Sequence, residues 1–353
     1  MKTTKIQWTD STVNPVMGCG GCELWPTSSR KVERALTDSL GGNSTAVLQG
    51  LVSGWTPQDF ARRKSELAQT LADELGNPEV GPKAKAAIDG ACRCYAGVLH
   101  ARYSGHSPGY AQNFNRPEFF AGRMLEASRW SDLRGRIRPN KPWLNGFPRL
   151  IFVSDMGDAL VKEMPFALLQ KEIIEVVASE KGRRHVWLWL TKRPARMAAF
   201  SDWLHERYIP WPDNLVAMTS VTSRRTVGRV DDLRRVRCRL KGLSVEPLWE
   251  SVKLPLDGID WVIVGGESGS AANPFDLAWA RELREQCREA EVAFFVKQLG
   301  ANPMNEGSDL KLGDRHGGDW AEWPEDLRVR EFPETFRSVA YELRRSADVG
   351  GAA

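Results

Sequence analysis

The chain has 353 residues, with 42% hydrophobic residues, 27% charged residues and a formal net charge of +4. No apolar run reaches the roughly 18 residues that a membrane span needs, and the first residues lack the apolar stretch of a secretory signal. We therefore expect a cytoplasmic protein without a membrane partner, and the small charge by itself predicts no nucleic-acid partner. Six cysteines in so long a chain predict metal-binding or catalytic thiols and argue against a disulfide framework.

The first 22 residues combine a short strand-like segment with a glycine-rich loop, NPVMGCGGC, that carries Cys19 and Cys22. Two thiols three positions apart on such a loop can face one point, which suits a metal ion, an iron-sulfur cluster or a redox disulfide. A third thiol is offered by Cys92 or Cys94. Cys238 and Cys287 lie in apolar periodic segments and are predicted to be core residues.

Residues 23–90 change character, because helical spacing replaces the loop pattern and a helix start is predicted at Thr56 and Pro57. We interpret this stretch as a helical insertion between the second and third thiols. A further helix is expected from Cys94 towards Tyr103, followed by a loop-rich segment with mixed basic and aromatic residues. Four of its cations form either a phosphate-facing run or a solvated face; they are Arg134, Arg136, Arg138 and Lys141.

From residue 149 onwards, short apolar runs alternate with amphipathic stretches, which is typical of βα units around a parallel sheet. The predicted strands are 150–153, 186–190, 215–218, 239–243, 261–264 and 293–296. Each ends in a polar cluster, and the carboxyl ends of parallel barrel strands meet at one mouth. The clusters contain Ser154, Asp155 and Asp158; Lys192; Ser220; Glu246; Gly266 and Glu267; and Lys297. We therefore predict that these clusters converge on one active site.

Such a mouth suits a zwitterion such as an amino acid. Asp155, Asp158 or Glu267 would bind its ammonium group, and Lys192 or Arg193 would bind its carboxylate. A salt bridge across the barrel rim is the competing explanation for Asp155 and Lys192. The glycines around Gly266 follow a strand but lack the residues of a nucleotide-binding loop, so they indicate close backbone approach to a ligand.

The chain contains a series of motifs, in the same order, that resembles the phage-associated, radical-SAM-like family of the DUF5131 type. That family is distantly similar to spore photoproduct lyase. The matching segments are 6–10, 14–15, 18–19, 94–96, 152–158, 190–194, 244–248, 261–269 and 295–300. The resemblance implies an α/β fold, namely a partial (βα) barrel of radical SAM type, with a 4Fe-4S cluster and S-adenosylmethionine as cofactors. The barrel would comprise residues 1–22 and 91–300, with a helical insertion at 23–90 and a C-terminal extension at 301–353.

Applied to this chain, the resemblance implies that Cys19, Cys22 and Cys94 ligate the cluster, with Cys92 as the alternative to Cys22. Residues 154–158 would meet the amino group of S-adenosylmethionine, and Lys192 or Ser220 would lie nearer its carboxylate or ribose. The expected substrate is nucleic acid, by lesion reversal or base modification, with phosphate contacts and stacking from residues 102–143. A radical enzyme acting on a peptide or small molecule, and a metal- or cluster-bearing binding protein without chemistry, are the alternatives. A small protein partner is compatible with each.

Overall fold

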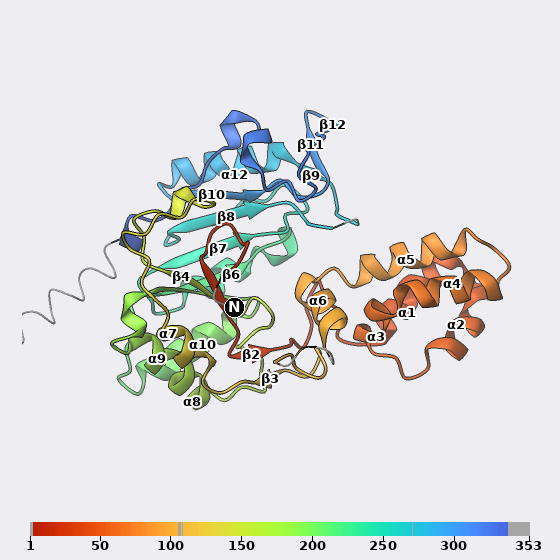
Figure 1. Cartoon of the computed structure of the whole chain (residues 1–353), viewed down its shortest axis with the longest axis horizontal. Coiled ribbons are helices and arrows are strands. Elements are labelled where there is room, and N and C mark those ends of the chain that lie inside the picture. Colours follow the sequence, from red (N-terminus) through yellow and green to blue (C-terminus); the bar gives the residue numbers. More distant parts are fainter. Residues whose placement is uncertain (1–2, 105–106, 108, 270, 338–353) are drawn as a thin grey trace, which may run out of the picture. The chain divides into compact units, whose positions relative to one another are not determined.

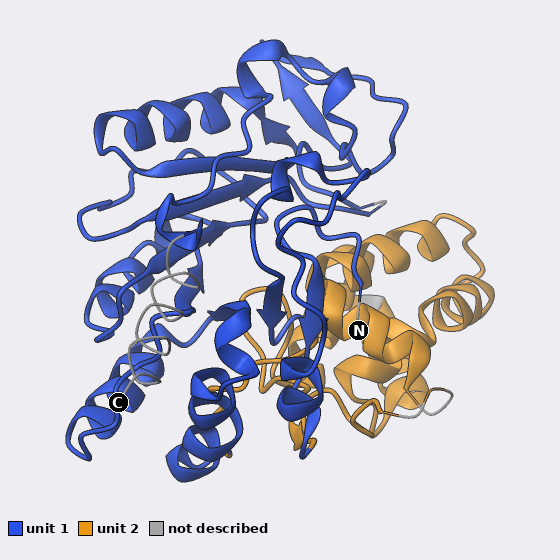
Figure 2. Ribbon diagram, turned by 60° about the vertical axis from the view of Figure 1, so that its left-hand side comes forward, with its two compact units in different colours: residues 1–15, 121–155, 164–353 blue, residues 16–120, 156–163 orange. Residues whose placement is uncertain are grey.

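A computed structural model describes residues 3–104, 107, 109–269 and 271–337 (Figure 1). The chain forms two compact units, one of residues 1–15, 121–155 and 164–353 and the other of residues 16–120 and 156–163 (Figure 2). We call them the sheet unit and the helical unit. Within the described ranges, no helix is long and apolar enough to cross a membrane.

The sheet unit is built on a seven-stranded sheet in the order β1-β4-β5-β6-β7-β8-β10, in which every neighbouring pair is parallel. Its strands are β1 (Ser11–Val13), β4 (Leu150–Val153), β5 (Val186–Thr191), β6 (Leu215–Ser220), β7 (Lys241–Val245), β8 (Trp261–Gly265) and β10 (Ala293–Gln298). The sheet curls into a half-barrel (Figure 1). The predicted partial βα barrel is thereby confirmed, although β7 begins and ends two residues later than expected.

The helices that follow these strands pack on one face of the sheet, where Trp189 of β5 contacts Phe200 and Trp211. The helices of this unit are α7 (Arg123–Ser128), α8 (Phe166–Leu169), α9 (Glu175–Ala178), α10 (Pro194–His205), α11 (Arg229–Arg234) and α12 (Leu277–Glu289). A π-helical turn, Gln170–Ile174, joins α8 to α9. A small sheet in the order β12-β11-β9 lies beyond β10, with β9 (Phe275–Asp276), β11 (Pro303–Asn305) and β12 (Ser308–Asp309).

The opposite face of the sheet holds an apolar core at the amino ends of the strands. Residues of alternate positions supply it, because successive side chains of a strand point to opposite faces. Its buried members include Leu150, Phe152, Val186, Leu188, Val216, Met218, Trp261, Ile263 and Phe295. Trp8 packs on Phe152, and Phe336 of the C-terminal segment packs on Trp261. The expected C-terminal extension, as far as residue 337, therefore contributes to this core, and residues 338–353 lie outside the described part of the chain.

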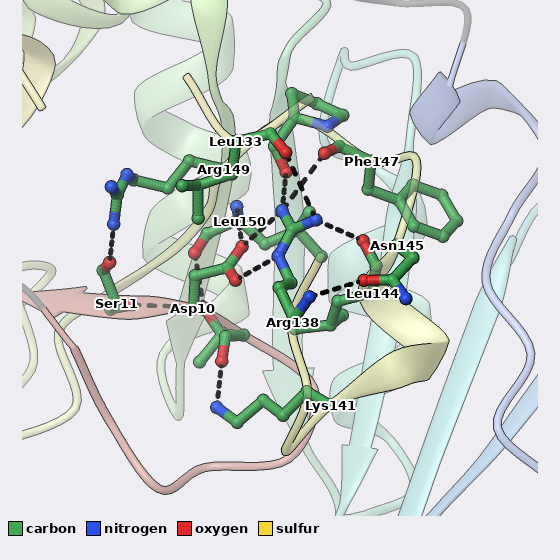
Figure 3. A network of polar contacts seen from close by, with 12 residues as sticks. Asp10, Ser11, Leu133, Arg138, Lys141, Leu144, Asn145, Phe147, Arg149 and Leu150 are labelled. Atoms are coloured by element: carbon green, nitrogen blue, oxygen red, sulfur yellow. Dashed lines mark hydrogen bonds and ion pairs between the residues drawn. The ribbon is translucent and has the colours of Figure 1, made fainter. Parts of the chain in front are cut away.

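Arg138 and Lys141 of the basic run at residues 134–141 have neither of the two roles predicted for the run, whereas Arg136 is exposed, as a solvated face predicts. Arg138 is buried, and its guanidinium donates to the Asp10 carboxylate at 2.7 and 3.2 Å and to the carbonyls of Leu144 and Phe147 (Figure 3). The ammonium of Lys141 donates to three backbone carbonyls of residues 4–9 at 2.6–2.8 Å. Because both cations are engaged in fastening the N-terminal segment to the sheet, neither is available to phosphate.

The helical unit contains α1 (Ser29–Leu40), α2 (Thr45–Val52), α3 (Pro57–Arg62), α4 (Lys64–Glu74), α5 (Val80–Ala91) and α6 (Tyr95–Tyr103), with a short antiparallel pair, β2 (Val16–Met17) and β3 (Glu118–Phe119). The helix start predicted at Thr56 is confirmed: its hydroxyl accepts from the Asp59 amide, the Asp59 carboxylate accepts in return, and Pro57 holds the first helical position. Apolar stripes of these helices enclose a separate core that includes Trp25 and Phe60.

Candidate functional site

The thiol loop is anchored through Gly18 to residues 156–158, which belong to the helical unit as Gly18 does. Gly18 donates its amide to the carbonyl of Met156 at 3.2 Å and accepts from the amide of Asp158 at 3.3 Å. A β-carbon added to Gly157 would lie 2.7 Å from the Gly18 oxygen, so only glycine allows this approach. Gly18 itself has φ +92°, a conformation that side chains disfavour. Backbone conformation at Gly18 and close backbone approach at Gly157 therefore explain why these two positions are glycine.

Leu24 links the segments that carry Cys22 and Cys94. Its amide donates to the Sγ atom of Cys22 at 3.4 Å, and its carbonyl accepts from the amide of Cys94 at 2.8 Å. The amide of Cys19 donates to the carbonyl of Phe114, whose ring packs edge-on against Trp25. Backbone hydrogen bonds thus bring the second and third predicted ligands into one neighbourhood, although about seventy residues separate them in the sequence.

The six cysteines differ in their surroundings. Cys19, Cys22 and Cys94 are partly exposed and belong to the thiol loop and the turn before α6. Cys92 is buried, and its thiol points to the carbonyl of Pro57 at 3.9 Å. Burial raises the pKa of Cys92 and Cys287 to about 12 and that of Cys238 to about 11. The three predicted ligands are all partly exposed, but so is Cys238, and of the two cysteines expected in the core only Cys287 is fully buried.

Among the side chains that the structure describes, no three of His, Cys, Asp and Glu gather closely enough to hold a metal ion. The donor type still fits a thiolate-bound cluster, because Cys19 and Cys22 on the glycine-rich loop and Cys94 at the start of α6 are partly exposed thiols.

The carboxyl end of the sheet unit's concave face is polar. Continuing each core position by two residues leads from Phe152 to Ser154, from Met218 to Ser220 and from Phe295 to Lys297, because side chains of one face recur every second residue. Lys192, Ser244 and Glu246 follow the same alternation on β5 and β7. Polar strand ends thus replace the apolar core at this edge, as the sequence predicts. That these residues share one cavity stays a prediction.

Ser154, at this edge of the sheet, has a buried side chain that lacks a hydrogen-bond partner among the described residues. It is only 5% exposed, and its hydroxyl has no hydrogen-bond partner in the described structure. Its φ of 75° lies in the left-handed region, which is unusual for a residue other than glycine. Buried polar groups are normally satisfied, and strained backbone collects at ligand sites, so Ser154 is a candidate ligand contact.

Asp155 and Asp158 stand at the same turn but have different roles. Asn14 donates to the carboxylate of Asp155 at 2.6 Å, and burial raises the pKa of Asp155. Asp158 is buried, and its carboxylate accepts from the amide of Leu160 two residues on. Asp158 therefore shapes the turn, whereas Asp155 offers a carboxyl group at the end of β4.

Lys192 and Ser220 are neighbours at the ends of β5 and β6. The ammonium of Lys192 donates to the Ser220 hydroxyl at 3.3 Å, and Arg229 donates to the Ser220 carbonyl at 3.1 Å. Ser244 is paired in register with Ser220 on the next strand. A row of donors therefore crosses three adjacent strands, which suits an anionic group such as carboxylate or phosphate.

Glu246 and Glu267 already have protein partners. Glu246 forms an ion pair with Lys297, and both side chains are less than a fifth exposed. The pair closes over β8 at Gly265, where a β-carbon would lie 3.5 Å from the Glu246 carboxyl carbon. The Glu267 carboxylate accepts from Trp249 and from the amide and side chain of Asn273. The salt bridge across the barrel rim was predicted for Asp155 and Lys192, and the pair found at this edge joins Glu246 to Lys297 instead.

Gly266 has a packing role. A β-carbon there would lie 2.3 Å from the carbonyl oxygen of Leu299, so the missing side chain allows two backbone segments to meet. Sequence reasoning placed Lys297 in a strand-end cluster without a specific role, and it assigned no individual role to Asn14 or Ser244. The signal for Ser244 and Lys297 is their two-residue spacing from core positions, whereas Asn14 depends on a contact across 141 residues.

By fold and by site, the chain is a parallel βα half-barrel protein with a cysteine-bearing loop and a polar carboxyl edge. It belongs to the DUF5131 family, described as proteins of unknown function, whose model matches residues 70–328. The family resemblance stated above is thereby confirmed, and similarity to spore photoproduct lyase stays a prediction. Comparison with curated proteins and with solved structures gives no match.

Proposed function

We propose that the chain is a radical S-adenosylmethionine enzyme. In this proposal Cys19, Cys22 and Cys94 hold a 4Fe-4S cluster, and the strand ends of the half-barrel bind S-adenosylmethionine. Three thiolates leave one iron of such a cluster open to a ligand, and the bound cofactor supplies a carbon-centred radical that abstracts hydrogen from a substrate.

The observation that carries the proposal is the link through Leu24, which associates Cys22 with Cys94 and leaves Cys92 facing Pro57. It supports Cys22 over Cys92 on geometry alone. The hydrogen bond that the Leu24 amide donates to Cys22 Sγ is also of the kind that stabilises a thiolate ligand.

The protein groups at the strand ends have separable tasks in this proposal. The carboxylate of Asp155, oriented by Asn14, would bind the ammonium of S-adenosylmethionine. Ser154 would donate its free hydroxyl to the same ligand. Lys192 and Ser220 would take the carboxylate or ribose hydroxyls. The apolar floor formed by Phe152 and Met218 would exclude water from the reacting atoms.

Anaerobic reconstitution tests the proposal. Wild-type protein should bind about four iron atoms, absorb in the visible region and, under dithionite, release 5′-deoxyadenosine from S-adenosylmethionine. Cys19→Ala, Cys22→Ala and Cys94→Ala should each lose most of the iron, whereas the matched controls Cys92→Ala and Cys287→Ala should retain it.

Two results would count against the proposal in different ways. Full iron retention in Cys22→Ala together with loss in Cys92→Ala would reverse the ligand assignment. Iron-loaded protein that neither binds S-adenosylmethionine nor releases 5′-deoxyadenosine would favour a binding protein without chemistry, and colourless protein containing zinc would identify a zinc-binding protein.

A further inference from the structure

We propose that the loops following β5 and β6 bind the phosphate backbone of a nucleic acid strand. We call residues 191–195 and 221–230 the basic loops. That this strand is the enzyme's substrate rests on the proposed function, but the binding itself does not. The inference places phosphate contacts at the carboxyl edge of the sheet and not at Arg138 and Lys141, which bind other parts of the chain.

The basic loops carry a concentrated positive charge. They contain five cations, Lys192, Arg193, Arg224, Arg225 and Arg229, and no Asp or Glu. Adjacent parallel strands lie about 4.8 Å apart, so the two loops start side by side. Their summed field attracts anions, and a polyanion gains most because it releases many counterions when it binds.

Two of these cations converge on one neutral residue. Lys192 donates to the hydroxyl of Ser220, and Arg229 donates to its carbonyl. Ser220 is 1% exposed and contributes only oxygen atoms to either contact. Both cations therefore lie beside the same buried residue at the carboxyl edge of the sheet.

The cations also extend outward from the strand ends. Arg224 is fixed by Glu250, whose carboxylate accepts from the Arg224 amide at 2.9 Å and lies 3.6 Å from its guanidinium. The next residue, Arg225, is exposed and makes no hydrogen bond or ion pair within the described part of the chain. Cations thus run from the partly buried Lys192 to the exposed Arg225. Successive phosphates of one strand fit such a series better than a single phosphate group does.

Fluorescence anisotropy with labelled 20-nucleotide single strands of DNA and of RNA tests the proposal on full-length protein, with no cluster required. Wild-type affinity should fall as salt rises from 50 to 200 mM, with a log–log slope of about −0.7 for each phosphate contact. Arg225→Gln should weaken binding about three- to tenfold at 50 mM salt and reduce the slope by about 0.7. Arg225→Glu should weaken binding further.

The matched control is Arg136→Glu, which makes the same charge change at another exposed arginine, outside the basic loops. It should leave affinity within about twofold of wild type, because Arg136 does not belong to the loops that are proposed to contact the phosphates. An equal loss in Arg136→Glu and Arg225→Glu would overturn the proposal, as would equal binding of poly-glutamate. Absence of binding to either strand would also overturn it, while iron content and 5′-deoxyadenosine release would still judge the proposed function separately.

Discussion

Asn14 Nδ2 lies 2.6 Å from Asp155 Oδ1, and this hydrogen bond joins the ends of β1 and β4. The two residues are 141 positions apart, yet the parallel pairing of Val13 with Val153 brings them level. Burial raises the pKa of Asp155, while the amide donor of Asn14 acts in the opposite direction and favours the carboxylate. Asn14 therefore orients the Asp155 carboxyl group and partly offsets the effect of burial on its pKa.

Asp155→Ala should weaken binding of S-adenosylmethionine about ten- to a hundredfold, because a charge-assisted hydrogen bond contributes about 1.5–3 kcal/mol. Iron content should not change. Asn14→Ala should have a smaller effect that grows as pH falls, since it raises the pKa of Asp155 further. Equilibrium dialysis of iron-loaded protein measures both, with the exposed Asp309→Ala as control. Unchanged affinity in Asp155→Ala would remove Asp155 from the cofactor site.

Removing one charge of the Glu246–Lys297 ion pair should lower the free energy of unfolding more than removing both charges. Lys297→Met alone leaves the Glu246 carboxylate largely buried without its partner, so the free energy of unfolding should fall by about 3 kcal/mol. The double variant Glu246→Gln/Lys297→Met should recover most of that loss. Urea unfolding of both singles and the double completes the cycle. Strict additivity would mean that the two charges do not interact.

Gly266→Ala should destabilise the fold by about 2–3 kcal/mol, because its β-carbon would lie 2.3 Å from the Leu299 oxygen and one backbone segment would have to shift. Gly228→Ala, with open space around the added methyl, is the control and should change stability by less than about 0.5 kcal/mol. Thermal unfolding reports both. If Gly266→Ala keeps wild-type stability and loses only ligand binding, the glycine serves the ligand instead.

His185 should make stability depend on pH. Its ring is fully buried, with Nε2 3.2 Å from the Ser128 carbonyl, and burial lowers its pKa to about 4. Between pH 6.5 and 4, His185 therefore binds a proton in the unfolded chain but not in the folded chain. The free energy of unfolding should fall as pH drops through this window, by at most about 1.4 kcal/mol per pH unit.

The His185→Gln variant has no imidazole at this position to take up the proton on unfolding. Below pH 6.5 the unfolding free energy of wild type should therefore fall more steeply than that of the variant. Urea unfolding at pH 7.5, 6, 5 and 4.5 measures the shift. Parallel curves for the two proteins would show that His185 is not protonated on unfolding in this range.

The sequence by itself determined the half-barrel and its polar edge. Apolar runs such as Leu150–Val153 are too short for helices and alternate with helical stretches, and a parallel sheet is the arrangement that buries both faces of such runs. The strand-end clusters follow from the same pattern, since parallel strands end at one edge. The helix start at Thr56 was equally local, because a capping residue contacts only the next turn.

Tertiary structure alone decided which polar groups are already engaged. Arg138 and Arg225 both lie in arginine-rich segments, yet Arg138 is buried against Asp10, 128 residues away, while Arg225 is exposed. The pairing of Glu246 with Lys297 likewise depends on strands that are not neighbours in the sequence. A cation's own segment does not encode its partner, because burial and long-range contacts arise only when distant segments pack together.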